Sequence, residues 1–185
     1  MKISYIIATA VMLVSFNANS AGNEDTMAVE SRMAVKEFFG ALKGELVGAM
    51  ETGGPVNAIN ACNTKAPEIA HTISDKNGWD VARTSLKLRN PVNAPDDWEK
   101  RVLEYFDKRA AAGDNLDTLE FYQVVDGNFR YMKAIPTAEK PCLACHGSKI
   151  DPKVEEALSG LYPDDKARGY KAGDIRGAFT ITRKM

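Results

Sequence analysis

The sequence predicts an α+β fold, in which an antiparallel sheet carries helices on one face or at one end. Two observations predict it. Apolar residues recur every three or four positions early in the chain, as in amphipathic helices, and β-rich runs follow between positions 119 and 182. Because the order is helices, a strand, a helix, a hairpin and a closing strand, rather than strict alternation, an antiparallel sheet is favoured.

The composition is typical of one folded domain. The chain has 185 residues, of which 44% are hydrophobic and 26% are charged, and its formal net charge is −1. A chain of this length can bury a real core in a single domain. The mixed charge gives no indication of a dedicated DNA or RNA surface, so we expect no nucleic-acid partner.

Residues 1–21 have the pattern of a secretory signal peptide. Lys2 precedes an apolar run from Ile3 to Phe16, and small and polar residues follow up to Ala21. The apolar run is shorter than the roughly 20 residues that span a bilayer. We therefore expect a periplasmic or otherwise exported protein, with one domain at residues 22–185 and no membrane span after cleavage.

Two amphipathic helices are expected in the first part of this domain. The first runs from about Glu24 to Met50, and the Gly53-Gly54-Pro55 segment ends it. The second runs from Pro55 to about Ile73. Pro67 lies inside it, where a missing backbone donor predicts a bend.

The later elements are marked by turn residues and by β-rich runs. Asp126-Gly127 between two such runs is a strong hairpin signal. The acidic start of the helix at Asp96 suits the helix dipole. In order, we expect a strand at 81–88, a loop with two prolines at 89–95, a helix at 96–111, hairpin strands at 119–125 and 128–135, a short helix at 152–158, a polar loop at 162–174 and a strand at 175–182.

A Cys-x-x-Cys-His segment follows the predicted hairpin. The thiols of Cys142 and Cys145 can add to the two vinyl groups of haem, and His146 then presents its imidazole to the iron. The chain has only three cysteines and two histidines, so a chance match to this spacing is rare. One covalently bound haem c is the expected cofactor.

A redox-active dithiol and a zinc site are the competing interpretations. A thioredoxin-type dithiol is expected at a strand-to-helix junction of a βαβ unit, whereas this segment follows a hairpin and Pro141. Zinc could use the same residues together with Cys62, but the adjacent Cys145 and His146 are poorly placed to bind one ion. Export also favours haem, because bacteria attach c-type haem outside the cytoplasmic membrane.

Cys62 is the first candidate for a second axial ligand. Free thiols are at risk of oxidation in an exported protein, and on a helix Cys62 shares an apolar face with Ile59, Ile69 and other residues. A small buried core residue is the alternative role. His71, near the opposite polar face, and Met132, in an alternating run, are further ligand candidates, with solvated and core roles as their alternatives.

Several segments, in order along the chain, resemble one family. They are Ala58–Cys62 with Ala66-Pro67, Arg83–Lys87 with Arg89–Pro91, Asn93 with Pro95-Asp96 and Trp98-Glu99, the 142–146 motif, and Gly173–Ala178. From about Phe38 to its end the chain is similar to the haem-containing PAS-like domains of unknown function, which occur alone in bacteria and as sensor regions of histidine kinases and chemoreceptors.

The resemblance implies a PAS-like antiparallel sheet with N-terminal helices and one covalent haem, whose axial ligands are His146 and Cys62. A thiolate ligand would lower the reduction potential. Arg83 and Arg89 are candidates for pairing with the haem propionates, with solvated surface arginines as the alternative. Trp98, Tyr122 and Tyr131 are expected to be packing residues.

Two functions fit these expectations. The first is an exported monohaem c-type cytochrome that exchanges electrons with an unidentified redox protein. The alternative is a periplasmic haem-based redox or gas sensor, in which a small ligand or a change of iron state displaces Cys62 and a signalling partner responds. Electron transfer is favoured because no kinase or signalling helix follows Met185. We expect no enzymatic activity, since an enzyme would need an open iron site with acid–base groups nearby.

Overall fold

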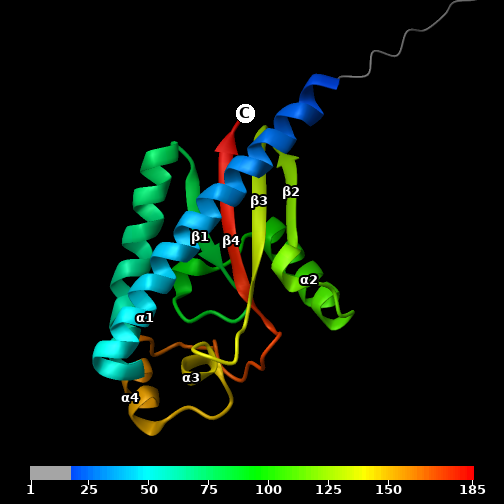
Figure 1. Ribbon diagram of the computed structural model, residues 1–185. Coiled ribbons are helices and arrows are strands. Elements are labelled where there is room, and N and C mark those ends of the chain that lie inside the picture. The colour runs from blue at the N-terminus through cyan, green and yellow to red at the C-terminus, as the bar shows by residue number, and fades with distance from the viewer. Residues whose placement is uncertain (1–17) are drawn as a thin grey trace, which may run out of the picture.

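The computed structural model describes residues 18–185, in which four antiparallel strands form a central sheet (Figure 1). The strands are β1 (Asp80–Thr84), β2 (Glu120–Val125), β3 (Asn128–Pro136) and β4 (Ile175–Lys184), and their order in the sheet is β1-β4-β3-β2. Every neighbouring pair is antiparallel. The predicted α+β class, with an antiparallel sheet and N-terminal helices, is therefore confirmed.

Helix α1 (Ala18–Asn77) consists of two arms that meet at Gly54. Gly54 has φ 69° and ψ −167°, a backbone conformation that glycine adopts without steric cost, and Pro55 then begins the second arm. Both predicted helices are confirmed. Among the described residues of α1 only Gly54 leaves the helical angles, so the chain reverses there, and Pro67 stays within the second arm.

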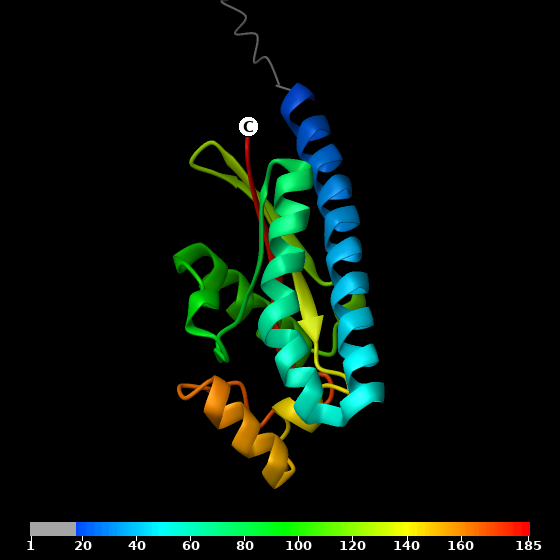
Figure 2. The same cartoon turned by 90° about the vertical axis from the view of Figure 1, so that its left-hand side faces the viewer.

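The two arms of α1 cover one face of the sheet (Figure 2). Phe38 from the first arm packs against Phe179 of β4 with ring centroids 5.1 Å apart, and both side chains are buried. Phe129 and Tyr131 of β3 complete this core. Burial of each large side chain contributes about 2–3 kcal/mol, which fixes α1 on the sheet.

Helix α2 (Asp97–Ala111) packs on the opposite face of the sheet. Its first turn has a capping box, in which Asp96 accepts from the Glu99 amide and Glu99 accepts from the Asp96 amide. Trp98 and Phe106 are buried here against Met132 of β3. Met132 is fully buried in this cluster, which gives it the core role considered above.

The hairpin of β2 and β3 turns at Asp126 and Gly127, whose φ angles of 50° and 74° are those of a tight hairpin turn. This prediction is confirmed. The strand predicted at 81–88 is too long, because β1 ends at Thr84. The hydroxyl of Ser85 donates to the carbonyls of Lys87 and Arg176, at 3.0 and 2.8 Å, and turns the chain away from the sheet.

The remaining segments lie at one end of the sheet. Helix α3 (Leu143–His146) is a single turn, and α4 (Pro152–Leu161) extends one turn beyond the prediction. Short 3₁₀ turns occur at Pro91–Asn93 and Leu116–Thr118. The predicted signal peptide lies largely outside the described residues, and within residues 18–185 no helix is long and apolar enough to cross a membrane.

Candidate functional site

The Cys142–His146 segment lies beyond β3, at the end of the sheet where the two arms of α1 meet (Figures 1 and 2). Helix α4 packs against the second arm of α1 there. Ile59 of α1 forms an apolar cluster with Val154, Leu158 and Tyr162, and Cys145 packs against it. The tertiary fold thus brings α1 next to the Cys-x-x-Cys-His segment.

All three cysteines are free thiols and partly buried. Burial raises the pKa of Cys62, and the charges of Arg83, Arg89 and Arg176 act in the opposite direction. Burial also raises the pKa of Cys145, whose neighbours include Arg89 and Cys62. Cys62 and the predicted haem-attachment segment therefore share one positively charged environment, although many residues separate them in the sequence.

His146 is held as a neutral imidazole with one unprotonated ring nitrogen. Its Nδ1 lies 2.8 Å from the carbonyl oxygen of Ala167, which can only accept a hydrogen bond, so Nδ1 carries the proton. Burial and the charges of Arg176 and Arg89 lower the pKa of His146 to about 2. Nε2 therefore keeps its lone pair, which is the form of histidine that binds metals.

Arg176 lies against the His146 ring. Its Nε is 3.2 Å from Nδ1 and 3.3 Å from Nε2. Because arginine only donates and Nδ1 already donates to Ala167, Nε2 is the acceptor of this hydrogen bond. A metal ion on Nε2 would replace the contact with Arg176. Tyr170 lies next to both, with its ring edge-on to His146 at 6.1 Å between centroids and 5.5 Å from the Arg176 guanidinium carbon.

A second layer of contacts connects the motif to the loop at 165–168. Arg89 donates to the carbonyls of Cys145 and Ala167, and its Nη2 lies 3.2 Å from a carboxylate oxygen of Asp165. The Asp165 side chain is only 1% exposed, and its other oxygen accepts from the Ala167 amide at 2.8 Å. The oxygen that pairs with Arg89 also lies 3.1 Å from Arg168 Nε, and Arg168 pairs with Glu155 as well. Asp165 and Glu155 together thus compensate Arg89 and Arg168, and Asp165 holds the Ala167 amide next to the carbonyl that fixes His146.

Arg83 and Arg176 differ from Arg89 in their charge balance. Burial lowers the pKa of both guanidinium groups. Arg176 donates to Ser85 Oγ at 3.0 Å, and Arg83 lies over the ring of Phe38 at 5.7 Å. Within the described part of the chain, neither forms an ion pair with a carboxylate.

The other sequence-predicted candidates lie elsewhere. The side chain of His71 is 78% exposed and lies 3.5 Å from Asp75, as expected of a solvated histidine. Trp98 and Tyr131 are buried core residues, and Tyr122 packs on Phe129 at 5.7 Å, so their predicted packing roles are confirmed. Among residues 18–185, no three His, Cys, Asp or Glu side chains are arranged to hold a metal by themselves, as a closed zinc site requires.

Sequence reasoning missed four contributors to the site: Asp165, Ala167, Tyr170 and Arg176. The first three lie in an irregular loop, where no periodic pattern marks a residue. Ala167 acts through its backbone carbonyl, which residue type does not reveal. Arg176 lies within the Gly173–Ala178 stretch, and that stretch was the one signal that pointed to it.

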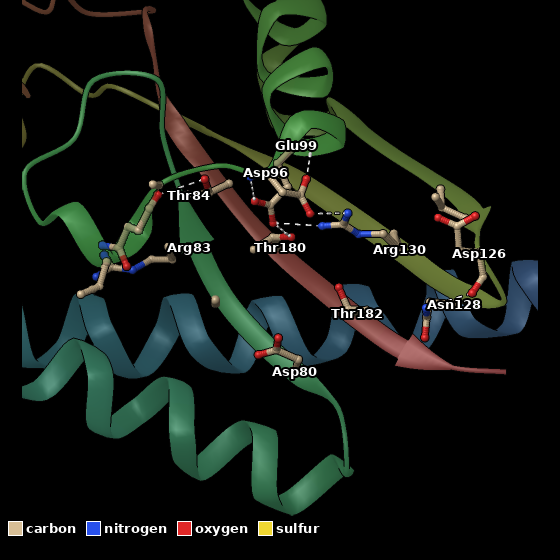
Figure 3. A pocket seen from close by; sticks show the side chains of 15 residues that line it. Asp80, Arg83, Thr84, Asp96, Glu99, Asp126, Asn128, Arg130, Thr180 and Thr182 are labelled. Atoms are coloured by element: carbon tan, nitrogen blue, oxygen red, sulfur yellow. Dashed lines mark hydrogen bonds and ion pairs between the residues drawn. The ribbon is translucent and has the colours of Figure 1, made fainter.

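A separate cavity of about 420 Å³ lies on the sheet face that carries α2 (Figure 3). Arg130 bridges Asp96 and Glu99, at 2.6 and 3.3 Å, and Thr180 donates to Glu99 at 2.7 Å. These contacts fix the first turn of α2, although the buried Nε of Arg130 has no hydrogen-bond partner among the described residues. Of the sequence-predicted site residues, Arg83 lines this cavity, whereas Cys62 and residues 142–146 do not.

Comparison with known proteins gives one family. A family model described as Tll0287-like: Tll0287 matches residues 14–183. The chain belongs to the Tll0287-like family. It is also similar to a solved structure, the crystal structure of the cyanobacterial heme-protein Tll0287, with 26% sequence identity and a TM-score of 0.61 over 92% of this chain and 98% of that chain. No curated protein matches.

The Tll0287-like match includes every residue of the candidate site. Cys62, the 142–146 segment and Arg176 all lie inside the matched range. The resemblance to a haem-containing PAS-like family, inferred from the sequence, is confirmed by this match and by the solved haem protein.

Proposed function

We propose that the protein is an exported monohaem c-type cytochrome that binds one haem through Cys142, Cys145 and His146 and transfers electrons. The observation that carries the proposal is the state of His146, which follows directly after two free thiols. It is a neutral imidazole whose Nδ1 is held by Ala167 and whose unprotonated Nε2 contacts only Arg176 among the described hydrogen bonds. The similarity to a cyanobacterial haem protein supports the same cofactor.

The residues present suit haem in their donor chemistry. Two thiols stand at the spacing that c-type attachment uses, and a third thiol and two arginines without carboxylate partners among the described residues lie in the same environment. When bound, haem supplies an iron that changes its charge by one electron. Cys142 and Cys145 each add their S–H across one vinyl double bond, forming a carbon–sulfur bond while the hydrogen goes to the neighbouring carbon, so no oxidant is needed.

Cys62 is the proposed second axial ligand. Its thiol must lose a proton to bind iron, since the thiolate is the ligand form. Arg83, Arg89 and Arg176 stabilise that negative charge, and this partly offsets the cost of burial. As a thiolate ligand together with His146, Cys62 would lower the reduction potential of the iron, because it would donate electron density to the metal.

A haem-based redox or gas sensor is the second candidate function. The observation that favours it is the position of Cys62 on the second arm of α1, eight residues after the break at Gly54. Loss of the bond between Cys62 and iron would free this arm from the site and give a two-state element that a partner can read.

Absorption spectra of the purified protein separate these candidates. Ferric and ferrous forms are recorded with and without carbon monoxide, for the wild type and for Cys62→Ala. We expect a covalent haem, a ferric spectrum that changes in Cys62→Ala, and no reaction of the ferrous wild type with carbon monoxide. Ready binding of carbon monoxide by the wild type favours the sensor, and absence of covalent haem contradicts both functions. Cell fractionation tests export in the same strains.

A further inference from the structure

We propose that Arg83 and Arg176 bind the two propionate carboxylates of the haem. The inference rests on the proposed haem function and deepens it, because it assigns the polar edge of the cofactor to two residues. It also replaces Arg89, one of the two arginines that the sequence suggested for this role.

Two of the three arginines near Cys62 have no carboxylate partner among the described residues. Arg83, Arg89 and Arg176 all act on Cys62. Asp165 pairs with both Arg89 and Arg168, and Arg168 also pairs with Glu155, so two carboxylates compensate these two cations. In residues 18–185 the other two guanidinium groups form no ion pair with a carboxylate. A buried cation is costly unless an anion compensates it. Two uncompensated cations match the two carboxylates of haem.

The sheet places both side chains at the same end of the site. Arg83 lies on β1 opposite Phe179 of β4, and these two strands are paired. Arg176 occupies an irregularity in β4, where Ile135 pairs with Gly177 and Pro136 with Ile175. The extra residue of such a bulge is re-aimed out of the regular alternation, and here its side chain reaches His146.

Aromatic rings orient the two guanidinium groups without using their donors. Arg83 lies over Phe38 at 5.7 Å, and Arg176 lies over Tyr170 at 5.5 Å. Stacked arginines keep their N–H groups directed outward, in the fork that binds a carboxylate through two parallel hydrogen bonds. Because the two side chains are already oriented, they lose less conformational entropy when they bind a carboxylate.

Arg176 has one donor that haem binding would release. Its Nε contacts Nε2 of His146, the nitrogen that the iron takes. Its Nη1 donates to Ser85 Oγ, a contact that does not involve the imidazole. The released Nε and the adjacent Nη2 form one edge of the guanidinium, which is a bidentate partner for a carboxylate.

The test is the midpoint potential of the full-length, haem-bearing protein as a function of pH. Arg83→Gln and Arg176→Gln are compared with the wild type, and Arg101→Gln, an exposed arginine of α2, is the control for loss of one positive charge. Arg83 has no hydrogen bond to His146 among the described contacts. A change in the midpoint potential of Arg83→Gln therefore cannot come from a lost contact with the His146 imidazole.

We expect each Gln variant to shift the iron equilibrium towards the ferric form about tenfold, or about 59 mV for a one-electron couple, because a propionate charge is left unbalanced. The propionate that loses its arginine also becomes easier to protonate. The potential should then gain a pH-dependent inflection on the acid side of neutrality. Arg83→Lys and Arg176→Lys, which keep the charge, should recover most of the tenfold change.

Several outcomes overturn the assignment. It is wrong if both Gln variants behave like Arg101→Gln, or if the potential shifts without a new inflection. It is also wrong if inorganic phosphate shifts the wild-type potential but not that of the variants, because the arginines would then bind a free anion. Lysine variants that behave like the glutamine variants overturn it too. A wild type without covalent haem contradicts the proposed function itself.

Discussion

The two ring nitrogens of His146 have different partners. Nδ1 donates to the Ala167 carbonyl, and Nε2 accepts from Arg176. The Ala167 carbonyl is held in turn by Arg89, whose charge Asp165 compensates. Partners of this kind set the tautomer and the orientation of a ligating histidine, and they are as necessary to a metal site as the ligand itself.

Asp165→Asn should strongly destabilise this end of the molecule. The substitution removes a buried carboxylate charge that Arg89 and Arg168 share and leaves Arg89 uncompensated, which costs about 3–5 kcal/mol in the free energy of unfolding. Urea denaturation measures it. Asp164→Asn changes an exposed neighbour of the same type and should cost less than about 0.5 kcal/mol. Equal effects of the two substitutions would show that the Asp165 carboxylate does not stabilise the site.

Cys62 and His71 offer a second comparison between single residues. Cys62→Ala should raise the reduction potential and change the ferric absorption spectrum, because a thiolate donor is lost. His71→Ala should leave both unchanged, since its side chain is 78% exposed. Redox titration with absorption detection measures the two quantities together. If the potential and the spectrum changed in His71→Ala but not in Cys62→Ala, His71 rather than Cys62 would be the iron ligand.

Among the elements, the junction of β1 with β4 depends on one glycine. A Cβ at Gly177 would lie 2.4 Å from the carbonyl oxygen of Thr84, which is far inside a van der Waals contact. Glycine therefore allows the end of β1 to approach β4 next to Arg176. The same close approach lets Ser85 reach the Arg176 carbonyl and end the strand.

Gly177→Ala should destabilise the protein by about 1–3 kcal/mol, because the strands must move apart to admit the methyl group. Gly160→Ala is the matched control, since a Cβ at this helical position of α4 meets nothing within 4 Å. Helix propensity predicts a gain of about 0.5–1 kcal/mol for the control. Thermal unfolding compares the variants, and a neutral Gly177→Ala would contradict the described register of β1 and β4.

The attachment of α1 to the sheet should depend on pH through Glu120 of β2. Burial alone would raise the pKa of Glu120, but hydrogen bonds from Arg32 and Tyr131 outweigh it and lower the pKa below its usual value. A lowered carboxyl pKa contributes stability above the unfolded-state value of about 4.3, and this stability is lost as the pH falls through the folded-state pKa.

Glu120→Gln should therefore cost about 1–3 kcal/mol at neutral pH, from the loss of charged hydrogen bonds. The difference from the wild type should shrink as the pH falls below 4. Denaturant unfolding at several pH values measures it, and Glu51→Gln, at an exposed position of α1, serves as control. A cost that does not change with pH would show that the carboxylate charge contributes nothing.

Most elements were predictable because their signals are local. The glycine–proline break in α1, the acidic start of α2 and the Asp-Gly hairpin turn each depend on a few neighbouring residues. The end of β1 was not predictable, because no glycine or proline interrupts Val81–Leu88. What ends the strand is the contact of Ser85 with Arg176, far away in the sequence.

At the scale of the whole molecule, the fold assembles the site from segments that are distant in the sequence. The second arm of α1 brings Cys62, and the segment after β3 brings the motif (Figure 1). Strands β1 and β4 bring Arg83 and Arg176, which have no carboxylate partner within residues 18–185. The sequence predicted the motif and Cys62 because they carry recognisable chemistry. The role of the loop around Asp165 could not be predicted from the sequence, since its contacts with Arg89 and His146 exist only in the folded chain.

The most direct test of the central claim is the mass of the purified protein, made in a bacterium that attaches c-type haem and then measured under denaturing conditions. We expect a chain heavier by one haem that keeps its haem absorption when unfolded. A double variant Cys142→Ala/Cys145→Ala should have the mass of the polypeptide alone. A wild-type chain without added mass, obtained from cells that load another c-type cytochrome normally, would contradict the account.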